Sequence, residues 1–126
     1  MKRVWIALSL LLMILAGTLA HSFYIASFTH DLSLLLEAAE VEAEQGAWDK
    51  AAELTEIAHE KWDQHGTYLH ITLRHTETDE IYTGFREVAE FIQCQEDGEY
   101  SAANARLIAN LELMAEAEQL TLQNVL

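Results

Sequence analysis

The hydrophobic and polar positions divide this chain into one long apolar segment followed by several amphipathic stretches. From Val4 to Phe28 almost every residue is apolar, and no Asp, Glu, Lys or Arg lies between Arg3 and Asp31. About 20 consecutive apolar residues are enough for a helix to span a bilayer. The pattern therefore predicts a transmembrane anchor over residues 1–28.

The flanks of this segment indicate an orientation in the membrane. Lys2 and Arg3 precede it, and basic residues are retained on the cytoplasmic side. Aromatic residues, which favour headgroup depth, lie near its two ends, namely Trp5, Phe23, Tyr24 and Phe28. We expect a single-pass protein of the cell membrane, with its N-terminus in the cytoplasm and the remainder of the chain outside.

A cleaved signal peptide is the alternative interpretation of the same segment. Thr18-Leu19-Ala20 offers small residues at a possible cleavage site, which would leave a mature chain beginning at His21. Signal peptides carry an apolar stretch of about 7 to 15 residues. The run here is longer, and its length favours an uncleaved anchor.

Beyond the anchor, glycines at intervals divide the chain into helical stretches. Gly46, Gly66 and Gly98 each follow a polar, helix-forming stretch, as glycines just past a helix C-terminus do. The chain contains no Pro. The predicted helices cover residues 31–45, 49–65, 67–95 and 100–119. Continuity of the first with the anchor and a break of the third near residues 76–78 are the alternatives.

Each predicted helix carries apolar residues at spacings of three and four, which mark its buried face. These residues are Leu32, Leu35, Leu36, Ala39 and Ala43; Ala51, Leu54, Ala58 and Trp62; Ile81, Phe85, Val88 and Ile92; and Leu107, Leu111, Met114 and Ala115. The expected fold class is all-α, with a transmembrane helix followed by a small antiparallel bundle of two αα-hairpins.

A faint internal repeat links the two expected hairpin turns. Gly46 precedes Trp48 by two positions, and Gly98 precedes Tyr100 in the same way, with an Ala five positions after each Gly. Tetratricopeptide-like hairpins use such a pattern to bring two antiparallel helices together. The motif occurs only twice and its spacing is unequal, which does not fit a true repeat array. Two plain αα-hairpins are therefore the better prediction.

The charge of the second part, residues 29–126, restricts its partners. All 21 acidic residues fall there with five basic residues, an excess of 16 negative charges. Nucleic-acid binding requires a basic surface and is excluded on this ground. The lone Cys94 cannot form an internal disulfide, and its position on the helical face of Val88 and Phe91 predicts a buried thiol.

The search for chemistry in the sequence returns few candidates. Phosphate-binding loops, nucleophile elbows and zinc motifs are missing, so we expect neither a catalytic residue nor a cofactor. The best local cluster of metal-ligand residue types consists of His75, Glu77, Asp79 and Glu80. His75 and Asp79 are four positions apart, where they would share a cation or simply form an ion pair at the start of a helix.

Several aromatic residues outside the anchor are candidates for binding a protein partner. They are Trp48, Trp62, Tyr68, Tyr82 and Tyr100. Trp and Tyr are preferred anchors at protein interfaces. Packing in the core and covering of turns is the alternative role for the same side chains.

The order of several short motifs gives a family resemblance over nearly the whole chain. After the Lys2-Arg3 start come Gly46-Ala-Trp48-Asp-Lys-Ala51, His59-Glu-Lys-Trp62, His75-Thr-Glu-Thr-Asp79-Glu80-Ile81 and the closing Leu120-Thr-Leu-Gln-Asn-Val-Leu126. This layout resembles a domain of unknown function found in small, membrane-anchored helical proteins of spore-forming Firmicutes. Thr67-Tyr68 and Cys94 depart from the pattern. The resemblance implies no activity and supplies no functional residues.

The sequence thus predicts a non-enzymatic, membrane-anchored accessory or adaptor protein. Its outward helical domain would bind another membrane or envelope protein, and self-association through the anchor is possible because Ala16 and Ala20 are small residues four apart. The alternative is an anchored or secreted cation-binding protein that uses its acidic surface and the His75–Asp79 cluster.

Overall fold

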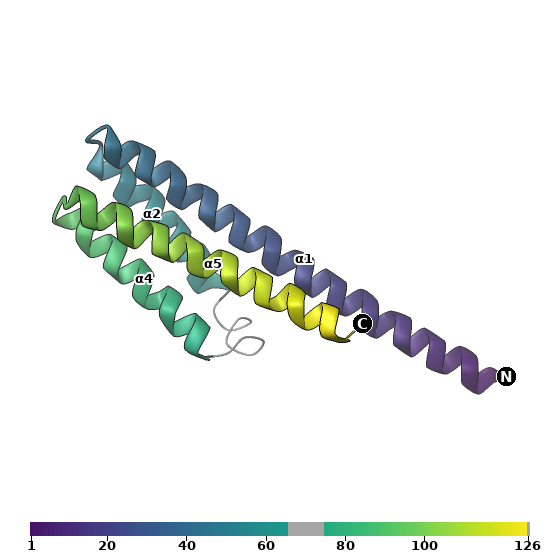
Figure 1. The fold of residues 1–126 in the computed structure, drawn as a ribbon. Coiled ribbons are helices and arrows are strands. Elements are labelled where there is room, and N and C mark those ends of the chain that lie inside the picture. Colours follow the sequence, from purple (N-terminus) through teal and green to yellow (C-terminus); the bar gives the residue numbers. More distant parts are fainter. Residues whose placement is uncertain (66–74, 126) are drawn as a thin grey trace.

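The computed structural model describes residues 1–65 and 75–125, and these residues form four helices. They are α1 (Lys2–Glu44), α2 (Trp48–Gln64), α4 (His75–Gln93) and α5 (Asp97–Val125), coloured along the chain in Figure 1. The all-α prediction is confirmed for the described part of the chain.

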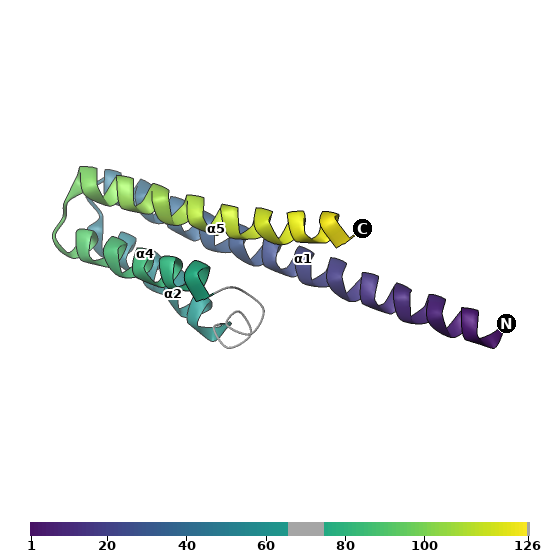
Figure 2. The same ribbon diagram turned by 60° about the horizontal axis from the view of Figure 1, so that its bottom comes forward.

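The four helices form a closed, antiparallel bundle. Helix α1 packs against α2 and α5, and α4 packs against the same two helices on the opposite side. Consecutive helices are joined as two hairpins, α1–α2 and α4–α5, as the sequence predicted. Figures 1 and 2 show that α1 and α5 are the long members and extend past the ends of α2 and α4. Helix α1 then continues alone toward the N-terminus.

Helix α1 consists of two chemically different halves without a break between them. Its 43 residues include no Pro, and its one Gly, Gly17, lies in the apolar half. The apolar half is exposed over its length. Burial begins at Ser22 and includes Ile25 and Phe28, so the core of the bundle starts before the position 28 boundary taken from hydropathy.

The core consists largely of the residues that the spacing predicted. Fourteen of the seventeen predicted core residues are buried, and the other three, Leu35, Leu54 and Ala115, are half-buried. On α4 every predicted residue, from Ile81 to Ile92, is buried. The period of 3.6 residues therefore identified the inward faces correctly.

The turn geometry agrees with one glycine prediction and corrects another. Gly46 has a φ of +81° just past the end of α1, where a left-handed conformation favours glycine. In the second turn the residue with positive φ is Gln95, at +55°, while Gly98 lies inside the first turn of α5. Gly66 lies outside the described residues.

Cys94 is exposed, so the prediction of a buried thiol is wrong. The prediction assumed that the helical pattern of Val88 and Phe91 continues through residue 95. Helix α4 ends at Gln93 instead, so Cys94 lies in the turn that leads to α5 and not on a buried helical face.

Polar contacts fix α1 against α5 along their length. The buried Asn104 donates through Nδ2 to the Leu36 carbonyl oxygen at 3.0 Å. Toward the hairpin turns, the Ser101 hydroxyl donates to the Glu40 carboxylate at 2.6 Å. These contacts join residues far apart in the sequence, and they set the register of the two long helices.

Candidate functional site

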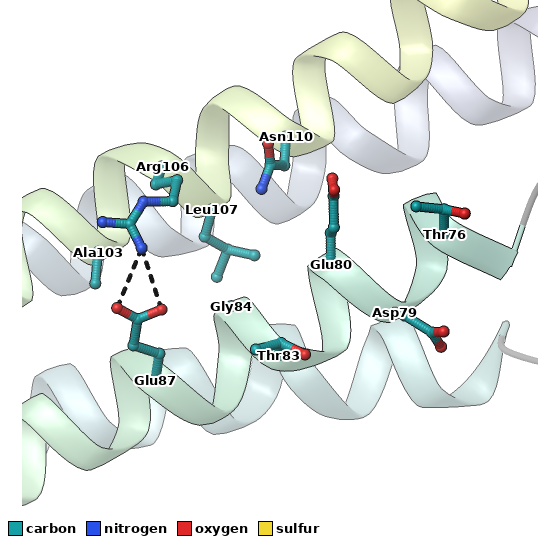
Figure 3. Close-up of a pocket in the computed structure, with 10 residues that line it drawn as sticks. All are labelled: Thr76, Asp79, Glu80, Thr83, Gly84, Glu87, Ala103, Arg106, Leu107 and Asn110. Carbon is teal, nitrogen blue, oxygen red and sulfur yellow. Dashed lines mark hydrogen bonds and ion pairs between the residues drawn. The ribbon is translucent and has the colours of Figure 1, made fainter.

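On the described part of the bundle, a groove of about 550 Å³ lies between α4 and α5 (Figure 3). Helix α4 contributes one wall and α5 the other. The lining residues are Thr76, Asp79, Glu80, Thr83, Gly84 and Glu87 from α4 and Ala103, Arg106, Leu107 and Asn110 from α5.

The floor of the groove depends on a glycine. A Cβ atom at Gly84 would lie 2.8 Å from Cδ1 of Leu107, which is fully buried. The missing side chain therefore lets α4 and α5 approach closely at this level. In Figure 3, Leu107 extends from α5 toward the Gly84 position and closes the bottom of the groove.

The rim of the groove carries more acid than base. One guanidinium nitrogen of Arg106 donates to both carboxylate oxygens of Glu87, at 3.2 and 3.3 Å. The positive charge of Arg106 and the negative charge of Glu87 therefore neutralise each other. Glu80 extends from α4 toward α5 on the side of Asn110, whereas Asp79 points away from α5 (Figure 3). Asp79 and Glu80 are thus the carboxylates in excess, and a positively charged group would be favoured there.

Two of the four predicted metal-ligand residues line this groove. Asp79 and Glu80 do so, while Glu77 is half-buried and does not belong to the lining. The side chain of His75 lies outside the described part of the structure. Among the side chains that are described, no three His, Cys, Asp or Glu residues come close enough together to hold a metal ion.

The predicted partner-binding aromatics separate into buried and exposed side chains. Trp62 and Tyr100 are buried in the core. Trp48 is half-buried and packs edge-to-face on Tyr100, with ring centres 5.6 Å apart. Tyr82 on α4 is exposed, and the Arg86 guanidinium lies 6.0 Å from the centre of its ring. Tyr68 lies outside the described residues.

Tyr100 also forms the inner wall of a smaller pocket of about 270 Å³ at the hairpin-turn end of the bundle. Glu40, Glu44, Asp97, Gly98 and Ser101 line the rest. Burial, and then the negative charges of Glu40 and Glu44, raise the pKa of the Tyr100 hydroxyl well above its usual range. Among the described residues this hydroxyl has no hydrogen-bond partner.

The predicted anchor residues fall on both sides of the point where burial begins. Lys2, Arg3 and Trp5 lie on the free, exposed part of α1. Phe23 is also exposed, at 76 % of its surface. Phe28, by contrast, is buried and stacks on Trp62 with ring centres 6.2 Å apart, and Tyr24 is half-buried beside it.

By length and composition, α1 is the one helix of the described chain that qualifies for crossing a membrane. The segment that qualifies is entirely exposed, unlike the core helix of a soluble protein. A signal sequence near the N-terminus satisfies the same criterion. The length and composition of α1 thus fit a membrane anchor and a signal sequence equally.

Comparison with protein families matches a domain of unknown function, DUF4363, over residues 19–125. The chain belongs to this family. The matched region begins close to the residue at which α1 enters the bundle, so the family domain corresponds to the four-helix bundle and not to the exposed apolar half of α1. Comparisons with curated proteins and with solved structures give no match.

Local patterns in the sequence indicated the acidic residues of the groove but not the groove itself. Asp79 and Glu80 were candidates because they follow His75 closely. Glu87, Arg106 and Asn110 were not candidates, because nothing in the sequence indicates that they line the same hollow between α4 and α5. The signal available in advance was Gly84, an isolated glycine within a strongly amphipathic helical pattern.

Proposed function

We propose that this protein is a membrane-anchored, non-enzymatic accessory protein whose helical bundle binds another membrane or envelope protein. One observation carries the proposal: the exposed apolar half of α1 and its buried half form one uninterrupted helix. In this proposal the N-terminus lies in the cytoplasm and the bundle lies outside, because Lys2 and Arg3 precede the apolar segment.

The continuous helix gives the proposed adaptor a defined orientation. At 1.5 Å per residue, the 43 residues of α1 are about 65 Å long. A helix that is embedded in lipid at one end and packed against α2 and α5 at the other has no flexible joint between the two. The bundle would stand upright on the membrane, with its two hairpin turns at the far end.

The groove between α4 and α5 is the surface that best fits the partner in this proposal. Its rim carries the carboxylates of Asp79 and Glu80, which form no ion pair with any described side chain, and the exposed Tyr82 lies on the same helix. Helix α4 is also the member of the bundle opposite α1. These features favour a partner with a basic segment, because complementary charge steers association and selects partners.

The experiment is an affinity purification from native membranes in gentle detergent, with the intact mass of the chain measured. The wild type is compared with an Asp79→Asn, Glu80→Gln variant, and a variant with the exposed α2 residues changed, Glu53→Gln and Glu56→Gln, is the control with the same change of charge. We expect a full-length mass and one stoichiometric companion that is lost only from the groove variant.

Two results would contradict the proposal. A companion retained by the groove variant would remove the groove as the binding surface. A mass that begins near His21, with no companion, would favour cleavage and the alternative of a secreted cation-binding protein. That alternative predicts a rise in melting temperature with a divalent cation, because a ligand that binds only the folded state stabilises it, and it predicts that His75→Ala removes the rise.

A further inference from the structure

The C-terminal end of α5 lies beside the apolar half of α1, past the point where the bundle ends. The His21 Nε2 atom of α1 lies 3.3 Å from the Glu118 Oε2 atom of α5, so these two residues are level with each other. Helix α5 runs antiparallel to α1 and continues for seven residues beyond Glu118, to Val125. That extension covers about 10 Å along the helix axis. Figures 1 and 2 both show this end of α5 alongside α1.

Beyond this level neither helix carries a charged residue until Arg3. On α1, no Asp, Glu, Lys or Arg lies between Arg3 and Asp31, and on α5 none follows Glu118. The exposed side chains here include large apolar groups: Leu120 exposes 58 % of its surface, and Phe23, two residues from His21, is exposed as well, while the exposed Gln119 is polar but uncharged. A zone without charged side chains and with exposed apolar groups suits lipid better than water.

The length of the anchor leaves no room to keep this zone in water. From Lys2 to His21, α1 rises about 28 Å at 1.5 Å per residue. The hydrocarbon core of a bilayer is about 30 Å thick. If Lys2 and Arg3 stay at the cytoplasmic surface, His21 lies at the outer boundary of the hydrocarbon. The end of α5 then lies at the depth of the lipid.

We propose that residues 119–125 of α5 form a second membrane-contacting element, which lies in the outer part of the bilayer beside the anchor. This inference rests on the proposed anchoring of α1. The C-terminal end of α5 favours contact with the outer part of the bilayer over contact with its centre. The last four carbonyl groups of a helix have no partner within it, so a position near the bilayer centre would leave them without hydrogen bonds.

The test places a polarity-sensitive NBD label on the full chain in phosphatidylcholine vesicles. In a Cys94→Ser background, single cysteines are introduced as Leu120→Cys on the proposed element, Leu12→Cys in the anchor and Ala102→Cys on the bundle. All three positions are exposed in the protein alone, so labelling leaves the core intact. Doxyl groups on the lipid acyl chains quench only labels that reach them.

We expect labels at positions 120 and 12 to lose fluorescence on addition of doxyl lipid, and the label at position 102 to keep it. Quenching at position 12 with none at position 120 would overturn this inference and leave the anchor in place. No quenching at position 12 would overturn the anchoring itself, and with it the inference. The two failures are therefore distinguishable in one experiment.

Discussion

Gly84 of α4 faces Leu107 of α5 so closely that a Cβ atom on the glycine would lie 2.8 Å from the leucine Cδ1 atom. Leu107 is fully buried, so its Cδ1 atom must shift to accommodate a side chain at position 84. We expect Gly84→Val to lower the free energy of unfolding by about 1–3 kcal/mol, the usual cost of overpacking. The better helix propensity of valine offsets only a few tenths of a kcal/mol. Urea unfolding in detergent, followed by circular dichroism, measures the change.

The matched control for this prediction is Gly98→Val. Nothing lies within 4 Å of a Cβ atom at Gly98, and the residue does not have a positive φ. We expect this variant to differ from the wild type by no more than about 0.5 kcal/mol, as surface substitutions usually do. Equal losses in the two variants would show that a general effect of valine, and not the contact with Leu107, governs position 84.

The Tyr100 hydroxyl contributes little to stability at neutral pH, in spite of its burial. Among the described residues it makes no hydrogen bond. A buried polar group without a partner costs free energy, and its removal is neutral or favourable. We therefore expect Tyr100→Phe to unfold at the same urea concentration as the wild type or at a higher one at pH 7. A loss above about 1 kcal/mol would mean that the hydroxyl has a partner in solution.

The same residue predicts a loss of stability in alkali. Burial and the carboxylates of Glu40 and Glu44 raise the pKa of Tyr100 in the folded state. Above about pH 10, the ordinary pKa of tyrosine, the unfolded chain releases this proton while the folded chain retains it. Stability is therefore full below pH 10 and falls as the pH rises toward the folded-state pKa. Melting curves between pH 9 and pH 11 should fall less steeply for Tyr100→Phe.

The hydrophobic period predicted the helices and their buried faces better than their ends. On α4, Ile81, Phe85, Val88 and Ile92 repeat at spacings of three and four, and all four are buried. The end of this helix was predicted two residues too late, because the cue used was Gly98, whereas the backbone turns at Gln95. A short turn must join two helices at a fixed spacing, and that requirement is not visible in the local pattern.

The candidate site was predictable only in part, because it depends on which residues face each other. The acidic run at Asp79 and Glu80 is evident from the sequence, and both residues line the groove. The groove also requires Arg106 to pair with Glu87 across two helices, a contact that no spacing within one helix predicts. Likewise, Trp62 and Tyr100 look like interface residues until the packing of Phe28 and Trp48 covers them.

Asn104 allows a test of the polar contact between α1 and α5. It is fully buried and donates through Nδ2 to the Leu36 carbonyl oxygen. Asn104→Asp keeps the shape but places a carboxylate against that oxygen. We expect a loss of roughly 2–3 kcal/mol at pH 7, the order expected for a buried charged group without a partner.

The pH dependence separates this effect from a change of packing. Burial raises the pKa of the introduced carboxyl group in the folded state, so the penalty is present above that pKa. It shrinks as the pH falls toward about 4, the ordinary pKa of aspartic acid. Asn104→Ala, which leaves a cavity and no charge, should differ from the wild type by the same amount at pH 5 and pH 7. A pH-independent loss for Asn104→Asp would contradict the explanation.

The exposed thiol of Cys94 reports on which side of the membrane the bundle lies. It is the single cysteine of the chain and lies in the turn between α4 and α5, at the end of the bundle remote from the apolar half of α1. With the N-terminus in the cytoplasm, a membrane-impermeant maleimide added to intact cells should label Cys94 fully. Cys94→Ser gives the background. Labelling that requires lysis of the cells would reverse the proposed topology, since the thiol would then lie on the cytoplasmic side and Lys2 and Arg3 outside.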